Sequence, residues 1–181
     1  MNFLSKTKNV RHAEWLVSLA YVFFFCSVAG WIWEEIYCLI KHGFWVERGF
    51  LFGPWLPIYG VGGSLLYILW DRAIKDPLRL FLAGVAVAGV VEYFGSLFLE
   101  LIFGKRWWDY TGIWFNIGGR IHLIGLMFFG IIGCAAVYFV IPPYKRTIEK
   151  MRERTRRTLC AVLLWIFSVD LIISAAVHFM T

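Results

Sequence analysis

Two kinds of ionisable residue stand out by type and position: carboxylates inside long apolar segments, and arginines in the polar loops between them. Glu34, Glu92 and Asp170 each lie within an apolar run. A carboxylate near the centre of a bilayer costs ~2.5–3.5 kcal/mol on insertion scales, so such a residue faces a partner, a cavity or the bundle interior. These three residues therefore predict buried polar contacts, which can serve ion pairing, ligand binding or proton transfer.

Helical spacing assigns two of these carboxylates to faces that partners can reach. In the first apolar segment one stripe follows the i, i+3, i+4, i+7 pattern: Trp31, Glu34, Glu35 and Cys38. In the third segment small residues and the acid recur at every fourth position: Gly84, Ala88, Glu92 and Ser96. Because small residues let helices approach closely, we expect Glu92 to be buried between helices.

A third stripe, in the last apolar segment, contains Asp170, Ser174 and His178. Two interpretations are open. An imidazole and a carboxylate on one face can form a proton path. Alternatively, Asp170 serves as the partner of a neighbouring polar group.

Two polar loops supply cations. Arg48 comes shortly before the second apolar segment, and Arg120 comes immediately before the fourth. A helix start favours an anion through its exposed N–H groups and its positive dipole end, and the guanidinium fork matches carboxylate or phosphate. Two arginines and two helix starts can therefore hold an anionic head group. The structural alternative is that both arginines pair with Glu34, Glu92 or Asp109 and neutralise them.

The second loop is also rich in aromatic residues. Four of them suit the aromatic belt at a membrane interface: Trp107, Trp108, Tyr110 and Trp114. Asp109 lies between these aromatics and Asn116 follows Trp114 by two residues, and a belt requires neither of them. The candidate ligand-binding residues are therefore Glu34, Arg48, Glu92, Trp108, Asp109, Tyr110, Asn116 and Arg120. No catalytic residue and no metal ligand is assigned.

The elements that must position these residues are membrane helices. The chain has 60% hydrophobic and 19% aromatic residues, and its mean hydropathy is +0.69, which exceeds what a soluble domain needs for its core. Five segments approach the ~20 apolar residues of a spanning helix. They are residues 15–40, 57–70 (or from 51), 78–103, 121–141 and 159–179. The sequence thus predicts an all-α integral membrane protein with a single polytopic domain over residues 1–181.

The basic residues give an orientation. Three segments hold 13 of the 18 Lys and Arg residues: the one before the first helix, the one between the second and third, and the one between the fourth and fifth. By the positive-inside rule these lie in the cytoplasm, with the N-terminus in and the C-terminus out. Both polar loops then share the outer face. The short cationic loop at 145–157 fits this rule and anionic lipid, so nucleic acid is not expected as a partner.

The loop at 43–57 is expected to fold back into the outer membrane boundary. Pro54 and Pro57 are excluded from a regular helix interior but suit a first turn, and several glycines permit tight turns. Irregular backbone at that depth must be buried in protein or line a wet cavity.

Other classes of site are not indicated. Cys26, Cys38, Cys134 and Cys160 are scattered without a C-x-x-C pair, so no disulfide framework or structural metal site follows. The chain has no G-x-x-x-x-G-K-[ST] motif that would cradle ATP, and no cofactor is expected. The N-terminal apolar stretch is too long for a cleaved signal peptide.

Several motifs together resemble a known family, the type IV ABC-transporter membrane proteins (CmpB-like). The matching features are Gly30 to Glu34, Arg48-Gly-Phe-Leu-Phe-Gly-Pro-Trp-Leu-Pro-Ile-Tyr-Gly60, Glu92-Tyr93, Trp107-Trp-Asp-Tyr110, and Asn116 to Arg120. They span residues 30–120, about half of the chain, and leave out His122 and the fifth helix. The resemblance implies a small multi-pass bacterial membrane protein that acts as a transporter component.

The sequence favours two candidate functions. The first is a permease-like or substrate-binding membrane subunit in the cytoplasmic membrane, with an outward-facing site for an anionic or zwitterionic molecule. The second is an integral-membrane enzyme that acts on a lipid-linked substrate, with Glu34, Glu92 or Asp109 as acid or base. The expected partners are membrane lipids, a separate ATPase subunit, and further copies or subunits, because five helices are few for a complete translocation path.

Overall fold

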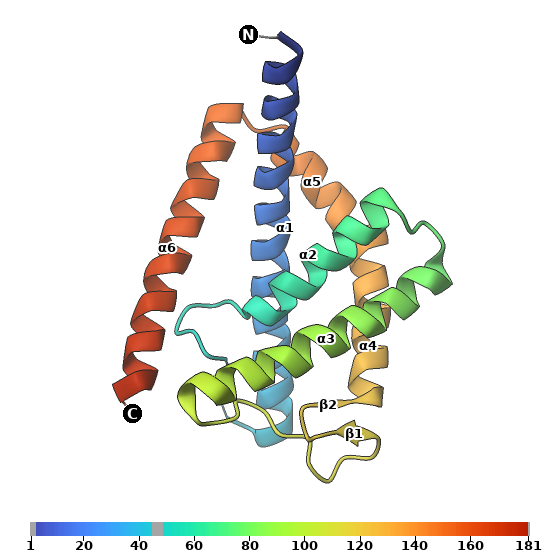
Figure 1. Ribbon diagram of the computed structural model, residues 1–181, viewed down its shortest axis with the longest axis vertical. Helices are drawn as coiled ribbons and strands as arrows, with labels where there is room; N and C mark the ends of the chain where they lie inside the picture. Colours follow the sequence, from blue (N-terminus) through green and yellow to red (C-terminus); the bar gives the residue numbers. More distant parts are fainter. Residues whose placement is uncertain (1–2, 45–48, 181) are drawn as a thin grey trace.

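The computed structural model describes residues 3–44 and 49–180, and helices make up most of it (Figure 1). The elements in chain order are α1 (Phe3–His42), α2 (Pro57–Arg72), α3 (Pro77–Phe103), β1 (Asn116–Ile117), β2 (Ile121–His122), α4 (Leu123–Ala135), the π-helical turn η1 (Ala136–Val140), α5 (Ile141–Glu149) and α6 (Glu153–Met180). The two short strands form an antiparallel pair, which the all-helical prediction lacked.

Four helical stretches in the described residues are long and apolar enough to cross a membrane: Ala13–His42, Pro77–Phe103, Leu123–Glu149 and Glu153–Met180. They make the chain a multi-pass membrane protein. The second predicted span corresponds to α2, whose 16 residues are about 24 Å long and so shorter than a hydrocarbon core. A fifth crossing and the inward N-terminus remain predictions.

The fourth and fifth predicted helices begin or end at other residues than expected. The chain from Leu123 to Glu149 stays helical through Pro142 and Pro143. Proline removes an N–H donor and clashes with the preceding turn, and the π-helical turn directly before these prolines relieves that clash. The basic run at 145–157 is therefore mostly helical, since only Lys150 to Arg152 separate α5 from α6.

Small residues bring α1 and α2 together. Gly60 lies against the side chains of Ser27 and Phe23, and Gly63 lies against Cys26. A Cβ atom at either glycine would collide with these side chains, so the close crossing depends on glycine. A buried cluster lies beyond this crossing, towards the N-terminal part of α1. It joins α1, α2 and α3 to η1 and α5, and its members are Val22, Leu66, Tyr67, Leu80, Val137 and Ile141.

The described part of the segment before α2, residues 49–56, returns to the middle of α1, which agrees with the expected fold-back. The Leu56 N–H donates to the Ser27 carbonyl at 3.0 Å. Ser27 lies 15 residues before the end of α1, which is about 22 Å along the helix axis. Figure 1 shows the same return, with α2 starting beside the middle of α1. Pro57 occupies the first turn of α2, where its missing N–H costs nothing.

Asp170 of α6 holds the returning segment. One of its carboxylate oxygens, Oδ2, accepts from the Gly53 N–H at 3.1 Å and from the Trp55 indole N–H at 2.6 Å. Its other oxygen accepts from the Ser174 hydroxyl at 3.2 Å. Asp170 is thus the partner of neighbouring polar groups, which was one of the two interpretations of its stripe.

The rest of that stripe continues the same contact. The Phe52 N–H donates to Ser174 Oγ at 3.2 Å, and His178 Nε2 lies 3.0 Å from the Phe50 carbonyl oxygen. Asp170, Ser174 and His178 lie one turn apart on α6. They therefore contact three polar backbone groups of the irregular segment 50–53, namely the Gly53 N–H, the Phe52 N–H and the Phe50 carbonyl. A proton path along the stripe remains a prediction.

Candidate functional site

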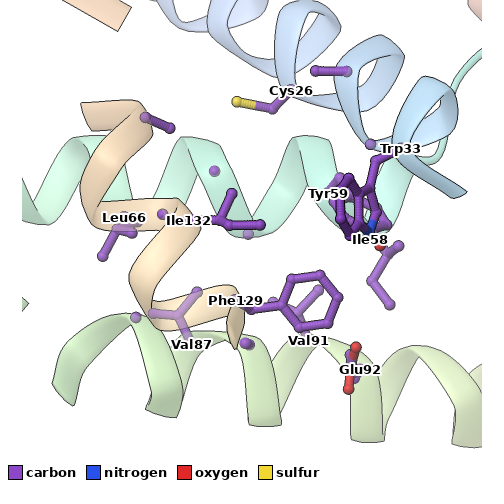
Figure 2. A pocket seen from close by; sticks show the side chains of 18 of the residues that line it. Cys26, Trp33, Ile58, Tyr59, Leu66, Val87, Val91, Glu92, Phe129 and Ile132 are labelled. Atoms are coloured by element: carbon purple, nitrogen blue, oxygen red, sulfur yellow. The ribbon is translucent and has the colours of Figure 1, made fainter. Parts of the chain in front are cut away.

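A cavity of about 330 Å³ lies between α1, α2, α3 and α4. Its walls are apolar or small side chains, with Glu92 as the charged residue among them. Figure 2 shows Trp33, Tyr59, Phe129 and Glu92 gathered at one end, with Leu66 and Ile132 towards the other. The volume falls at the lower end of the range of about 300–1,000 Å³ that small-molecule sites occupy.

Small residues on four helices create this space. Gly84 of α3 lies against the backbone of Gly130 of α4, and this close contact fixes the α3–α4 crossing. Gly62 of α2 faces open space, where a Cβ atom would meet no neighbour within 4 Å. Ala29 and Ala88 contribute only a methyl group to the lining. The helices therefore meet at their small residues and leave a gap between these contacts.

Tyr59 and Glu92 line the polar end of the cavity, and Glu34 joins them through a hydrogen bond to Tyr59. The Tyr59 hydroxyl donates to Glu34 Oε1 at 2.6 Å. Glu92 is only 8% exposed, as its stripe predicted, and it interacts electrostatically with Glu34. Tyr110 is close enough to act electrostatically on Tyr59. The structure thus brings together Glu34, Glu92 and Tyr110 from three separate parts of the chain.

Arg120 lies farther along the same face of α3. Its Nη1 donates to Ser96 Oγ at 2.9 Å, and its Nη2 forms an ion pair with Glu100. Glu100 also accepts from Arg106 Nε at 3.0 Å. Arg120 therefore pairs with a carboxylate, as the structural alternative proposed, but the partner is Glu100 and not Glu34, Glu92 or Asp109.

Aromatic residues of the 104–122 loop pack against the rest of the structure. The Trp108 indole N–H donates to the Arg120 carbonyl at 3.0 Å, and the ring reaches Gly95 of α3. The ring centroids of Tyr110 and His122 are 4.6 Å apart. Trp108 and Tyr110 thus pack towards the helices, in addition to any role in an aromatic belt.

His122 closes the N-terminus of α4. Its Nδ1 accepts from the Gly125 N–H at 3.2 Å. Accepting this hydrogen bond requires a neutral ring with its proton on Nε2. Partial burial lowers the pKa of His122, which favours that neutral form. The start of α4 is therefore already capped by a side chain.

Asp109 and Asn116 shape the loop itself. Asp109 Oδ1 accepts from the hydroxyl of Thr111 at 2.5 Å and from its N–H at 2.8 Å, and these bonds lower the pKa of Asp109. Asn116 donates to the Ile113 carbonyl at 2.7 Å and accepts from the Gly119 N–H at 3.0 Å. Both side chains bond within three residues of themselves, which is the usual behaviour of Asx turns.

The sequence identified part of this arrangement. Arg48 lies outside the described residues. Tyr59 is not among the residues that the sequence predicted, although it lies inside the motif from Arg48 to Gly60. Its hydrogen bond to Glu34 depends on how α1 and α2 cross, which the motif by itself does not reveal. Glu100 was also missed, but extending the stripe of every fourth residue beyond Ser96 reaches it.

Comparisons with known proteins identify the family of this chain. Neither a curated protein nor a solved structure matches the chain. One family model, described as "Putative ABC-transporter type IV", matches residues 21–175. The match covers α2, α3, α4 and the loops between them, together with most of α1 and α6. The chain therefore belongs to this family of multi-pass membrane proteins related to ABC transporters.

Proposed function

We propose that this chain is a permease-like membrane component that binds a small zwitterionic molecule in the cavity between α1 and α4. The observation that carries the proposal is the order of charges along α3. Glu92 faces the cavity, and Arg120 binds Ser96 one turn farther along, about 6 Å away along the axis. A ligand with an ammonium and an acidic group can match both charges.

The chemistry of the cavity favours the zwitterionic over the anionic class of ligand. An ammonium group would lie against Glu92 and over the rings of Trp33, Tyr59 or Phe129, which attract cations. Its acidic group would extend towards Arg120, whose fork suits carboxylate or phosphate. A ligand with only negative charge would meet Glu92, and the described residues of the cavity wall include no Lys or Arg to offset the repulsion.

The rest of the transporter would come from other chains. Family membership supports a separate ATPase subunit, since this sequence has no ATP-cradling motif. We place the complex in the cytoplasmic membrane, with further copies or subunits completing the path. The polar end of the cavity would face outwards, because the basic segments lie at the other end of the helices.

Mass spectrometry of small molecules that co-purify with the protein tests the proposal directly. We expect an unchanged zwitterionic molecule that is retained by the wild type and lost from Glu92→Gln. A turned-over product of a lipid-linked substrate would instead support the enzyme that the sequence left as the alternative.

Binding of a phosphocholine amphiphile to the purified protein gives a quantitative test. Glu92→Gln keeps the size of the side chain but removes its charge, so affinity should fall about tenfold or more. The matched control is Glu149→Gln, an exposed position on α5 far from the cavity, which should bind like the wild type. Equal affinity in the wild type and Glu92→Gln would contradict the proposed site.

A further inference from the structure

We propose that the ligand reaches the cavity sideways from the bilayer, through a window between α1 and α4, and is therefore a membrane-borne amphiphile. This inference rests on the proposed function and names the class of molecule and its route. Three features of the cavity support it: closed ends, an open side, and an apolar frame around that side.

Both ends of the cavity are closed by packed side chains. At the end near Leu66, the buried cluster with Val22, Tyr67 and Leu80 fills the space between the helices. At the other end, the rings of Tyr59 and Phe129 pack with centroids 5.3 Å apart. The 104–122 loop lies beyond that end, where Trp108 reaches Gly95 of α3 and Tyr110 acts electrostatically on Tyr59. In the part of the chain that the structure describes, packed side chains therefore obstruct the path of a water-soluble molecule along the helix axes.

The side between α1 and α4 is open. Trp33 of α1 and Ile132 of α4 line the cavity, yet they are 42% and 41% exposed. Ala29, which lies between Phe25 and Trp33 on the same face of α1, is also exposed. Residues that line a cavity and are exposed at the same time mark its mouth.

Two aromatic pairs frame this mouth. Trp33 packs against Phe128 of α4 with ring centroids 5.3 Å apart. Phe25 packs against Tyr144 of α5 with ring centroids 4.5 Å apart. Phe25 and Trp33 are eight residues apart on α1, about 12 Å along its axis. Between the two pairs the α1 residues that line the cavity are small, namely Cys26, Ala29 and Gly30, so the window stays unfilled.

The frame suits an acyl chain. Its side chains are mostly aliphatic or aromatic carbon, so a polar molecule would gain little in passing it, whereas a hydrocarbon chain stays in largely apolar surroundings throughout. The head group would lie at the Glu92 end, and the chain would extend through the window into the bilayer. This arrangement explains how a cavity of modest volume can serve a larger lipid-like molecule.

Photolabelling in lipid nanodiscs tests the window. The probe is a lysophosphatidylcholine with a diazirine on its acyl chain, and glycerophosphocholine, which has no chain, serves as the water-soluble competitor. Peptides of the cavity wall are quantified by mass spectrometry. In the wild type we expect saturable labelling that glycerophosphocholine does not block at concentrations equal to the probe.

Two variants change the window in opposite directions. Ala29→Trp should reduce labelling about tenfold, because an indole ring fills the gap between the aromatic pairs. Ile132→Ala should raise it about twofold by widening the mouth. Ala135→Trp, at an exposed position of α4 that does not line the cavity, is the matched control and should label like the wild type. Gel filtration checks that each variant is folded.

The outcomes separate the two proposals. Wild-type labelling in Ala29→Trp and in Ile132→Ala would overturn the lateral window and leave the cavity site standing. Full block by equimolar glycerophosphocholine would also overturn it, because the route would then be aqueous. Absence of any cavity labelling in the wild type would overturn the proposed function, and the window with it.

Discussion

The two polar segments that precede α2 and α4 look alike in the sequence but are held in opposite ways. The segment at 50–56 is bonded by distant parts of the chain, namely Asp170, Ser174 and His178 of α6 and the Ser27 carbonyl of α1. The 104–122 loop is held largely by its own side chains, Asp109 and Asn116. Arg120 then fastens this loop to α3.

This difference follows from depth. A loop at the end of the helices can leave some backbone groups to water, so short-range turns suffice. A segment that returns to the middle of α1 lies between the helices, so its N–H and C=O groups depend more on protein partners. Polar residues on α6 supply these partners. The segment at 50–56 should therefore be far more sensitive to single substitutions than the 104–122 loop.

The largest effect is expected for Asp170→Ala. The change leaves the Gly53 N–H and the Trp55 indole N–H without their acceptor, which should lower the free energy of unfolding by about 2–4 kcal/mol. Thermal unfolding in detergent and hydrogen exchange of residues 50–56 measure it. Ser168→Ala, on the same helix with only a local bond to Leu164, is the control. Similar melting of both variants would show that α6 does not hold the segment.

An intermediate effect is expected for Arg120→Lys. Lysine cannot bond Ser96 and Glu100 at once with a fixed fork, so the attachment of the loop to α3 should weaken. We expect Tm to fall by about 3–6 °C and affinity for the zwitterionic probe to fall about tenfold. Arg106→Lys, at a more exposed partner of Glu100, should change both quantities less. A larger effect of Arg106→Lys would show that Arg106, and not Arg120, is the main attachment of the loop to α3.

The smallest effect concerns pH and His122. Its pKa is lowered in the folded protein, so the unfolded chain binds more protons once the pH falls below the ordinary histidine value of about 6.5. The stabilisation by the neutral cap is therefore present above that pH and lost as the pH falls. Tm should drop by a few degrees between pH 7 and pH 5.

His122→Asn provides the control for this prediction. Asparagine also caps a helix N-terminus but does not titrate, so the pH-dependent part of the Tm change should shrink. An unchanged pH profile in this variant would assign the dependence to other groups.

Much of the fold could be predicted from the sequence because membrane insertion depends on local properties. Apolar length alone indicated the multi-pass class, and Pro57 with the nearby glycines indicated the folded-back segment. Spacing by four residues placed Glu92 on a buried face, which its low exposure confirms. The ends of the helices were less predictable, because Pro142 and Pro143 were accommodated by a π-helical turn.

Only the tertiary structure decided which groups the charged residues contact. The sequence predicted that Glu34, Glu92 and Asp170 face a partner, a cavity or the bundle interior, since an isolated charge in lipid is too costly. It did not determine that Glu34 meets Tyr59, that Asp170 meets the backbone of residues 50–56, or that Arg120 meets Glu100. These choices depend on which helices cross and at what depth, and that is set by small residues such as Gly60 and Gly84 acting between segments far apart in the chain.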